Sequence, residues 1–123
     1  MSVKKRVLIV DDSEVMREMI SDTLIKNGFE VAGGASDGAE AVEQYRALKP
    51  DIVTMDIVMP KEHGIEAVKK IVELDESACI IIISGLYQKS LVMDALEMGA
   101  KDFLIKPFEP ADLMNSIKKS LAS

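Results

Sequence analysis

The stretch DIVTMDIVMP, residues 51–60, is a strand-like apolar run with a single carboxylate, Asp56, in its middle. Burying an isolated ionised carboxylate costs several kcal/mol or forces it to take up a proton. Asp56 therefore needs a counter-charge, a metal ion or a position where the strand leaves the core. The rest of the chain indicates which of these applies.

Apolar runs of this kind alternate with longer amphipathic stretches along the whole chain. The runs read as strands, and the stretches between them carry apolar residues at helical spacing. The five runs are VLIV (7–10), FEVAGGAS (29–36), IVTMD (52–56), CIIIIS (79–84) and DFLI (102–105). The pattern therefore predicts five strands, each followed by a helix.

Strands that read as continuous apolar runs are buried on both faces, which indicates a parallel sheet covered by helices. Five strands are too few for a closed eightfold barrel, so we expect an open, doubly wound α/β sheet. The 123 residues suffice for one domain, and no linker or low-complexity tract divides them. We expect a single domain over residues 1–123.

Local signals mark where the helices begin and end. Asp12 or Ser13 is expected to cap the first helix, whose buried stripe includes Val15 and Met19. Asp37 followed by Glu40 predicts a capping box at the second helix.

The formal charge of −6 argues against a nucleic-acid partner, because phosphate backbones require a basic face. Cys79 is the only cysteine, so it cannot form an internal disulfide, and a small buried hydrophobe is its expected role. The apolar runs are too short to span a bilayer, and MSVKKR does not resemble a signal peptide. We expect a cytoplasmic protein that does not bind membranes.

Polar residues stand where the predicted strands end. In an open parallel sheet these carboxyl ends lie on one edge, where such sheets bind their ligands. We therefore expect Asp56 to face solvent and the other carboxylates at that edge. The residues are Asp11 and Asp12 after the first strand, Asp56 at the third, Ser84 and Gly85 at the fourth, and Lys106 and Pro107 after the fifth.

Three converging carboxylates repel one another, and a hard divalent cation relieves that repulsion. An oxygen-only ligand set favours Mg²⁺, which prefers to share its coordination shell with a phosphoryl group. Ser84 and Lys106 can serve a phosphoryl group as a hydroxyl donor and a counter-charge. The pattern indicates phosphoryl transfer onto Asp56, with Mg²⁺ as cofactor.

The segments VLIVDDS, PDIVTMDIVMP, IIIIS and GAKDFLIKPF together resemble a response-regulator receiver domain, over essentially the whole chain. The resemblance is greatest to stand-alone, CheY-like chemotaxis regulators. It implies a flavodoxin-like fold with strand order 2-1-3-4-5. It also implies that Asp56 is the phosphoacceptor and that Lys106 pairs with the phosphoryl group.

The resemblance further assigns metal and switch residues. Asp11, Asp12 and Asp56, with the backbone carbonyl of Val58, would hold Mg²⁺. Ser84 and Phe103 match the switch hydroxyl and the switch aromatic, and the Lys106–Pro107 peptide bond would be cis. His63 stands where an aspartate is common in the family, and its role stays open.

The implied function is a phosphorylation-activated switch of a two-component system. Asp56 would accept a phosphoryl group from a CheA-like histidine kinase, which serves as the donor. The face of the fourth helix, fifth strand and fifth helix would bind a motor switch protein or an adaptor. Phosphorylation and autodephosphorylation would be self-catalysed rather than the work of a conventional enzyme. We expect a monomer.

Four alternatives stay open. A Mg²⁺-dependent phosphatase with an aspartyl-phosphate intermediate has similar chemistry, but it usually needs a general acid where this chain has Val58. A flavin or nucleotide carrier on the same fold should have a phosphate-binding loop where this chain has DDSEVM. The third alternative is a single-domain receiver in a non-chemotaxis phosphorelay. The fourth is a receiver that has lost phosphorylation and works only as a docking module.

Overall fold

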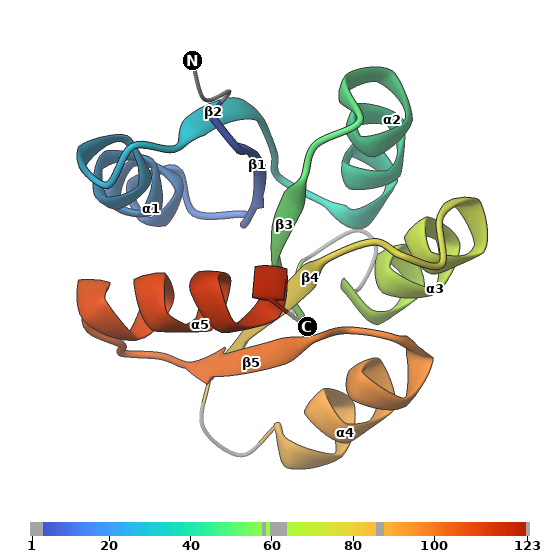
Figure 1. The fold of residues 1–123 in the computed structure, drawn as a ribbon. Helices are drawn as coiled ribbons and strands as arrows, with labels where there is room; N and C mark the ends of the chain where they lie inside the picture. The colour runs from blue at the N-terminus through green and yellow to red at the C-terminus, as the bar shows by residue number, and fades with distance from the viewer. Residues whose placement is uncertain (1–3, 58, 60–63, 86–87, 123) are drawn as a thin grey trace.

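The computed structural model describes residues 4–57, 59, 64–85 and 88–122. Strands and helices alternate in it as the sequence predicts (Figure 1). The elements are β1 (Arg6–Val10), α1 (Glu14–Lys26), β2 (Glu30–Ala35), α2 (Gly38–Leu48), β3 (Ile52–Asp56), α3 (Gly64–Leu74), β4 (Ile80–Ser84), α4 (Lys89–Met98), β5 (Asp102–Ile105) and α5 (Pro110–Ala122).

All five strands are parallel and lie in the order β2-β1-β3-β4-β5. This confirms the doubly wound, flavodoxin-like α/β fold. The chain runs from β1 to β2 on one side and then to β3 on the other side of β1. The carboxyl ends of β1 and β3 therefore flank the point where strand order reverses, which is where open α/β sheets bind ligands.

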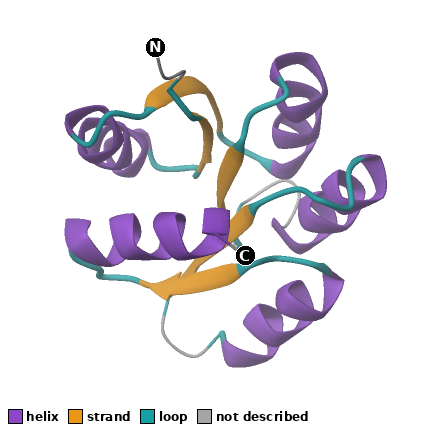
Figure 2. Cartoon of the chain, in the orientation of Figure 1, coloured by secondary structure: helices purple, strands orange, loops and turns teal. Residues whose placement is uncertain are grey.

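Helices cover both faces of the sheet. α1 and α5 pack on one face, and α2, α3 and α4 pack on the other (Figures 1 and 2). Alternate residues of each central strand point to opposite faces, so Leu8 and Ile82 belong to the core under α2, α3 and α4, whereas Ile9 and Ile81 belong to the core under α1 and α5. Among the described helices, none combines the length and the apolar composition that crossing a membrane requires.

α1 and α2 begin at side-chain caps. Ser13 Oγ accepts a hydrogen bond from the Met16 N–H at 3.2 Å, so Ser13 caps α1. Asp37 Oδ1 accepts from the Glu40 N–H at 2.9 Å, which confirms half of the predicted capping box. Glu40 Oε1 also accepts from the N–H of Ser36, one residue before the cap, at 2.6 Å.

Two predictions of burial were wrong. Val15 and Met19 were placed on the buried stripe of α1, but they are 67% and 58% exposed. The buried row of α1 contains Ile20 and Leu24, and the neighbouring row that holds Val15 and Met19 turns toward solvent. β5 was expected to be buried on both faces, but it is an edge strand, and alternate residues of it are exposed.

Cys79 is buried immediately before β4, in the core under α1 and α5, as expected for a small hydrophobic residue. Burial raises the pKa of its thiol, although the nearby charge of Lys101 acts in the opposite direction. A thiol with a raised pKa is a poor nucleophile.

A hydrogen bond joins the C-terminal ends of α2 and α3. Tyr45 donates its hydroxyl to Asp75 Oδ2 at 3.0 Å, and Asp75 Oδ1 accepts from the Ser77 N–H and Oγ at 3.0 and 2.7 Å. Burial, and then the hydrogen bond and charge of Asp75, raise the pKa of Tyr45 to about 12. The bonds from Ser77 and then from Tyr45 lower the pKa of Asp75.

Candidate functional site

Three carboxylates meet at the strand-order reversal. Asp11 and Asp12 follow β1, Asp56 is the last residue of β3, and each offers an oxygen within 4.8 Å of the others. Asp11 and Asp56 are buried, at 0% and 6% exposure, while Asp12 is exposed. An oxygen-only donor set of this charge fits a hard divalent cation such as Mg²⁺.

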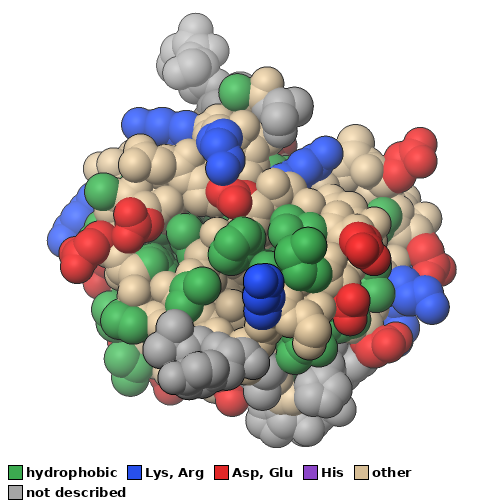
Figure 3. Space-filling model, turned by 90° about the horizontal axis from the view of Figure 1, so that it is seen from below, with side chains coloured by type: hydrophobic (Ala, Val, Ile, Leu, Met, Phe, Trp, Pro, Cys, Tyr) green, Lys and Arg blue, Asp and Glu red, His purple; other side chains and the backbone are tan. Residues whose placement is uncertain are grey.

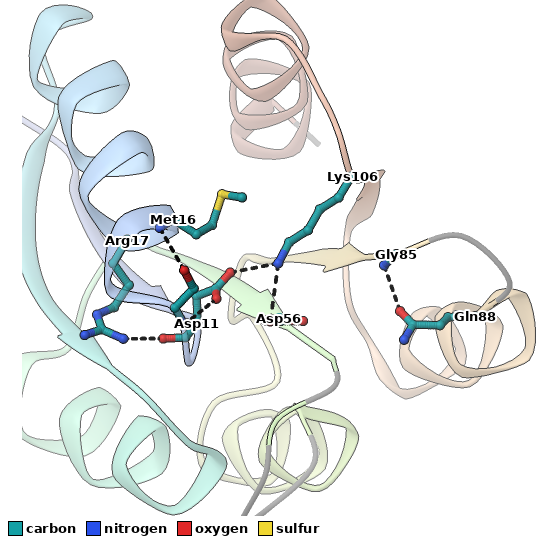
Figure 4. A network of polar contacts seen from close by, with 8 residues as sticks. Asp11, Met16, Arg17, Asp56, Gly85, Gln88 and Lys106 are labelled. Atoms are coloured by element: carbon teal, nitrogen blue, oxygen red, sulfur yellow. Dashed lines mark hydrogen bonds and ion pairs between the residues drawn. The ribbon is translucent and has the colours of Figure 1, made fainter.

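Asp56 was expected to face solvent, and this was wrong. Its side chain is almost entirely covered. Lys106, from the segment after β5, lies over the cluster, with Nζ 3.1 Å from Asp11 Oδ2 and 3.4 Å from Asp56 Oδ2 (Figure 4). The ammonium group supplies the counter-charge that a buried carboxylate needs.

The position of Lys106 depends on the backbone around it. Its N–H donates to the Ser84 carbonyl at 2.7 Å, which ties it to the end of β4. The Lys106–Pro107 peptide bond is cis, as the resemblance implied. Burial lowers the pKa of Lys106, but hydrogen bonds and charges of Asp11 and Asp56 outweigh that effect and hold the pKa above its usual range.

The N–H, the main-chain oxygen and both carboxylate oxygens of Asp11 each make a polar contact. Its N–H donates to the Ala35 carbonyl at 3.0 Å, and its Oδ1 accepts from the Ser13 N–H at 2.9 Å. Its Oδ2 contacts Lys106, and its main-chain oxygen accepts from Arg17 Nη1 at 2.5 Å (Figure 4). These contacts fix the direction of the Asp11 carboxylate.

Ser84, the last residue of β4, is 1% exposed. Its Oγ has no hydrogen-bond partner among the residues that the structure describes. Buried hydroxyl groups are normally paired, so an unpaired one marks strain or a group that is partnered in another state. The adjacent Gly85 N–H donates to Gln88 Oε1 at 2.8 Å (Figure 4).

A cavity of about 310 Å³ lies between α4 and the ends of β4 and β5. Phe103, on β5, lines this cavity and is 39% exposed. The full lining is Ser84, Gly85, Gln88, Lys89, Val92, Met93, Phe103 and Ile105. Ser84 and Phe103, both predicted as switch residues, therefore lie on one cavity.

The start of α3 packs directly against the backbone of β3. The Gly64 N–H donates to the Ile57 carbonyl at 2.7 Å. A Cβ on Gly64 would collide with the carbonyl oxygen of Asp56 and lie 2.9 Å from the Cα of Ile57. Only glycine fits here without moving the backbone that carries Asp56.

The structure brings together all of the predicted side chains that it describes at this edge of the sheet, namely Asp11, Asp12, Asp56, Ser84 and Lys106. Val58 and His63 lie outside the described residues. The sequence reasoning missed Arg17 and Gln88. Both act on main-chain groups of the site, and neither residue type signals such a bond in a sequence.

Comparison with known proteins gives a consistent family. Residues 7–118 match the response regulator receiver domain family. The chain is 52% identical to the chemotaxis protein CheY of Thermotoga maritima over 115 residues, covering 94% of this chain and 96% of that protein. It is also 52% identical to CheY of Bacillus subtilis over 116 residues, covering 94% and 97%.

Solved structures agree with this assignment. The response regulator domain of Thermotoga maritima CheB superposes with a TM-score of 0.90 at 36% identity, covering 98% of both chains. A complex of CheX, CheY, beryllofluoride and Mg²⁺ from Borrelia burgdorferi matches with a TM-score of 0.91 at 39% identity, covering 95% of this chain and 89% of the other. The chain therefore belongs to the response regulator receiver domain family, among receivers related to the CheY chemotaxis proteins.

Proposed function

We propose that Asp56 accepts a phosphoryl group from a phosphohistidine of a sensor kinase. A carboxylate oxygen of Asp56 bonds to phosphorus as the P–N bond breaks, and the imidazole leaves with the bonding electrons and takes up a proton. The observation that carries this proposal is the convergence of Asp56 with Asp11, Asp12 and Lys106 at one edge of the sheet.

Asp11, Asp12 and Asp56 would hold Mg²⁺, with the backbone carbonyl of Val58 as the family resemblance implies. Bound there, Mg²⁺ would neutralise charge on the carboxylates and on the transferring oxygens. The chemistry of the donor set supports this assignment, as does the relative from Borrelia burgdorferi whose solved complex contains beryllofluoride and Mg²⁺.

Lys106 and Ser84 would respond to the new phosphoryl group. Phosphorylation adds roughly two negative charges and several strong acceptor oxygens. Lys106 already lies within 3.4 Å of Asp56, so its ammonium can follow those charges with little movement. The hydroxyl of Ser84, which has no partner among the described residues, would gain a phosphoryl oxygen as its acceptor.

Movement of Ser84 would change the position of Phe103 and thereby the output face, which is the surface formed by α4, β5 and α5. A phosphorylation of this kind biases a two-state element, because it stabilises one state more than the other. Here Phe103 would turn from its exposed position into the cavity that it shares with Ser84. This would alter the surface that α4, β5 and α5 present.

Exposed apolar residues support that surface as the output face. Met93 on α4 and Ile105 on β5 are 49% and 43% exposed, beside Phe103. In Figure 3, which views the molecule from the side of β5 and α4, hydrophobic side chains gather in the middle of the face. By analogy with the CheY relatives, its partners would be a CheA-like kinase and a motor switch protein or adaptor in chemotaxis.

We also propose that residues 1–123 act as one domain. Every described strand belongs to one sheet, and the two cores lie on its two faces.

Labelling by acetyl phosphate in the presence of Mg²⁺ tests the proposal. Asp56→Asn should abolish labelling while circular dichroism shows an intact fold. Asp94→Asn, which removes the same charge from an exposed site on α4, is the matched control and should label like the wild type. Labelling that persists in Asp56→Asn would place the acceptor elsewhere, and steady turnover of a small phosphoester would favour the phosphatase alternative.

A further inference from the structure

Arg17 reaches from the first turns of α1 back to the turn that follows β1. Its Nη1 donates to the main-chain oxygen of Asp11 at 2.5 Å, in a partly buried position (Figure 4). Its aliphatic stem lies beside the edge strand, where a Cβ on Gly34 would be 3.6 Å from Arg17 Cδ. The guanidinium is thus held between α1, β2 and the turn that carries the acidic pair.

This bond does not serve the helix to which Arg17 belongs. The acceptor is six residues earlier, before α1 begins, and α1 already has a cap at Ser13. α1 is anchored to the sheet separately, through the buried Ile20 and Leu24. The interaction therefore acts on the Asp11 turn rather than on helix formation.

Among the described residues, Asp11 has four hydrogen-bonding partners, and Arg17 is the one that can be changed with the least effect on the rest of the site. The partners of its N–H and its Oδ1 are main-chain groups of Ala35 and Ser13. Lys106, the partner of Oδ2, belongs to the proposed phosphoryl site itself. A substitution of Arg17 keeps all three carboxyl groups and Lys106 in the protein and removes the side-chain donor to the main-chain oxygen of Asp11.

We infer that Arg17 is a positioning residue for the cation site. By holding the main-chain oxygen of Asp11, it keeps the Asp11 carboxylate directed at Asp12 and Asp56. This inference rests on the proposed function, because it gives Arg17 a role in the same Mg²⁺ site.

Residues that orient metal ligands have measurable effects on metal binding. Removing such a residue lowers metal affinity by about 10- to 100-fold. A purely structural role would lower thermal stability but leave the Mg²⁺ affinity of the folded protein unchanged. The Mg²⁺ affinity of the folded variants therefore separates the two roles.

The experiment compares three substitutions at Arg17 with one control. Arg17→Met removes both donor and charge, Arg17→Gln keeps a donor without the charge, and Arg17→Lys keeps both. Arg46→Met, at an exposed position on α2, changes the net charge by the same amount and is the matched control. Mg²⁺ affinity is measured by calorimetry, and hydrogen exchange of the Ser13 amide is followed by NMR in Mg²⁺-free buffer.

The Ser13 amide donates to Asp11 Oδ1, so its exchange reports the direction of that carboxylate without a metal. Arg17→Met should weaken Mg²⁺ binding about tenfold and speed exchange of the Ser13 amide. Arg17→Lys should restore both quantities most of the way to wild type, and Arg46→Met should change neither. If Arg17→Met does not fold, Arg17→Gln is compared with Arg17→Lys instead. Mg²⁺ affinity and exchange of the Ser13 amide are then measured on those two variants.

Wild-type Mg²⁺ affinity and wild-type Ser13 exchange in Arg17→Met would overturn the assignment of Arg17. An equal loss of affinity in Arg46→Met would also overturn it, because the effect would then be one of net charge. A wild-type protein that binds no Mg²⁺ would instead overturn the proposed function.

Discussion

Lys106 Nζ lies 3.1 Å from Asp11 Oδ2, although the two residues follow strands that are separated in the sheet by β3 and β4. The side chain of Lys106 extends across the carboxyl ends of both intervening strands, and its ammonium group also contacts Asp56 at the end of β3. The cation that is proposed to pair with a phosphoryl group is thus already shared between two buried carboxylates in the unphosphorylated protein.

Lys106→Met should make stability depend more strongly on Mg²⁺. Without the ammonium, three carboxylates lie close together with no lysine between them, so the Tm in metal-free buffer should fall. Bound Mg²⁺ stabilises the folded state by mass action, and its effect should be larger where it relieves more repulsion. Thermal unfolding with and without Mg²⁺ measures the difference.

Lys119→Met is the control for that experiment. Lys119 pairs with Asp102 at 3.4 Å but is largely exposed, and exposed pairs contribute about 0–1 kcal/mol. Mg²⁺ should change the Tm of Lys119→Met by the same amount as the Tm of the wild type. If Mg²⁺ raises the Tm of Lys106→Met by no more than it raises the Tm of the wild type, Lys106 does not offset the carboxylate charges.

Ser84→Ala should separate phosphorylation from the response to it. Because the buried Oγ has no partner among the described residues, its removal should leave the free energy of unfolding within about 1 kcal/mol of wild type or raise it. Asp56 should still be labelled, but NMR signals of the Phe103 ring should no longer shift on adding beryllofluoride. A wild-type shift in Ser84→Ala would remove Ser84 from the switch.

Thr54→Val should stabilise the protein. Thr54 is fully buried in β3, and in the part of the chain that the structure describes its Oγ1 has no hydrogen-bond partner. Replacing an unpaired buried hydroxyl by a methyl group of similar shape removes a desolvation cost of about 1–3 kcal/mol. Urea unfolding should give a higher midpoint with an unchanged slope, and a lower midpoint would show that Thr54 has a partner in solution.

Tyr45→Phe should change stability at alkaline pH. The pKa of Tyr45 is raised from 10.0 to about 12, so the folded state holds this proton more tightly than the unfolded state. That contribution is fully present below pH about 10 and is lost as the pH rises toward 12. Tyr45→Phe should be less stable than wild type at neutral pH, and its stability should decline less steeply above pH 10. Parallel pH profiles would contradict the prediction.

The order and type of the elements followed from the sequence, because most strands are short apolar runs and each helix carries an apolar stripe. β2 is the weakest case, since its run begins with Glu30 and contains two glycines. β3 was predicted at its observed bounds, since Pro50 and Asp56 mark its two ends clearly. The site followed for a similar reason. Parallel strands bring their carboxyl ends to one edge, so polar residues at those ends must lie near one another.

The burial of the Asp56 side chain could not be predicted, because Lys106, which contacts it, is 50 positions away in the sequence. The contact of Arg17 with Asp11 was missed since its acceptor is a main-chain oxygen, and every residue has one. The bond from Tyr45 to Asp75 joins residues 30 apart through side chains that fit many other roles. Such contacts arise from packing geometry rather than from local pattern.

The bond between Tyr45 and Asp75 lies where α2 and α3 end, at the opposite end of the strands from the acidic cluster. The surroundings of Tyr45 could therefore be redesigned for higher stability without changing any residue of the proposed phosphoryl site. If such a redesign nevertheless altered signalling, the two ends of the sheet would have to be mechanically connected.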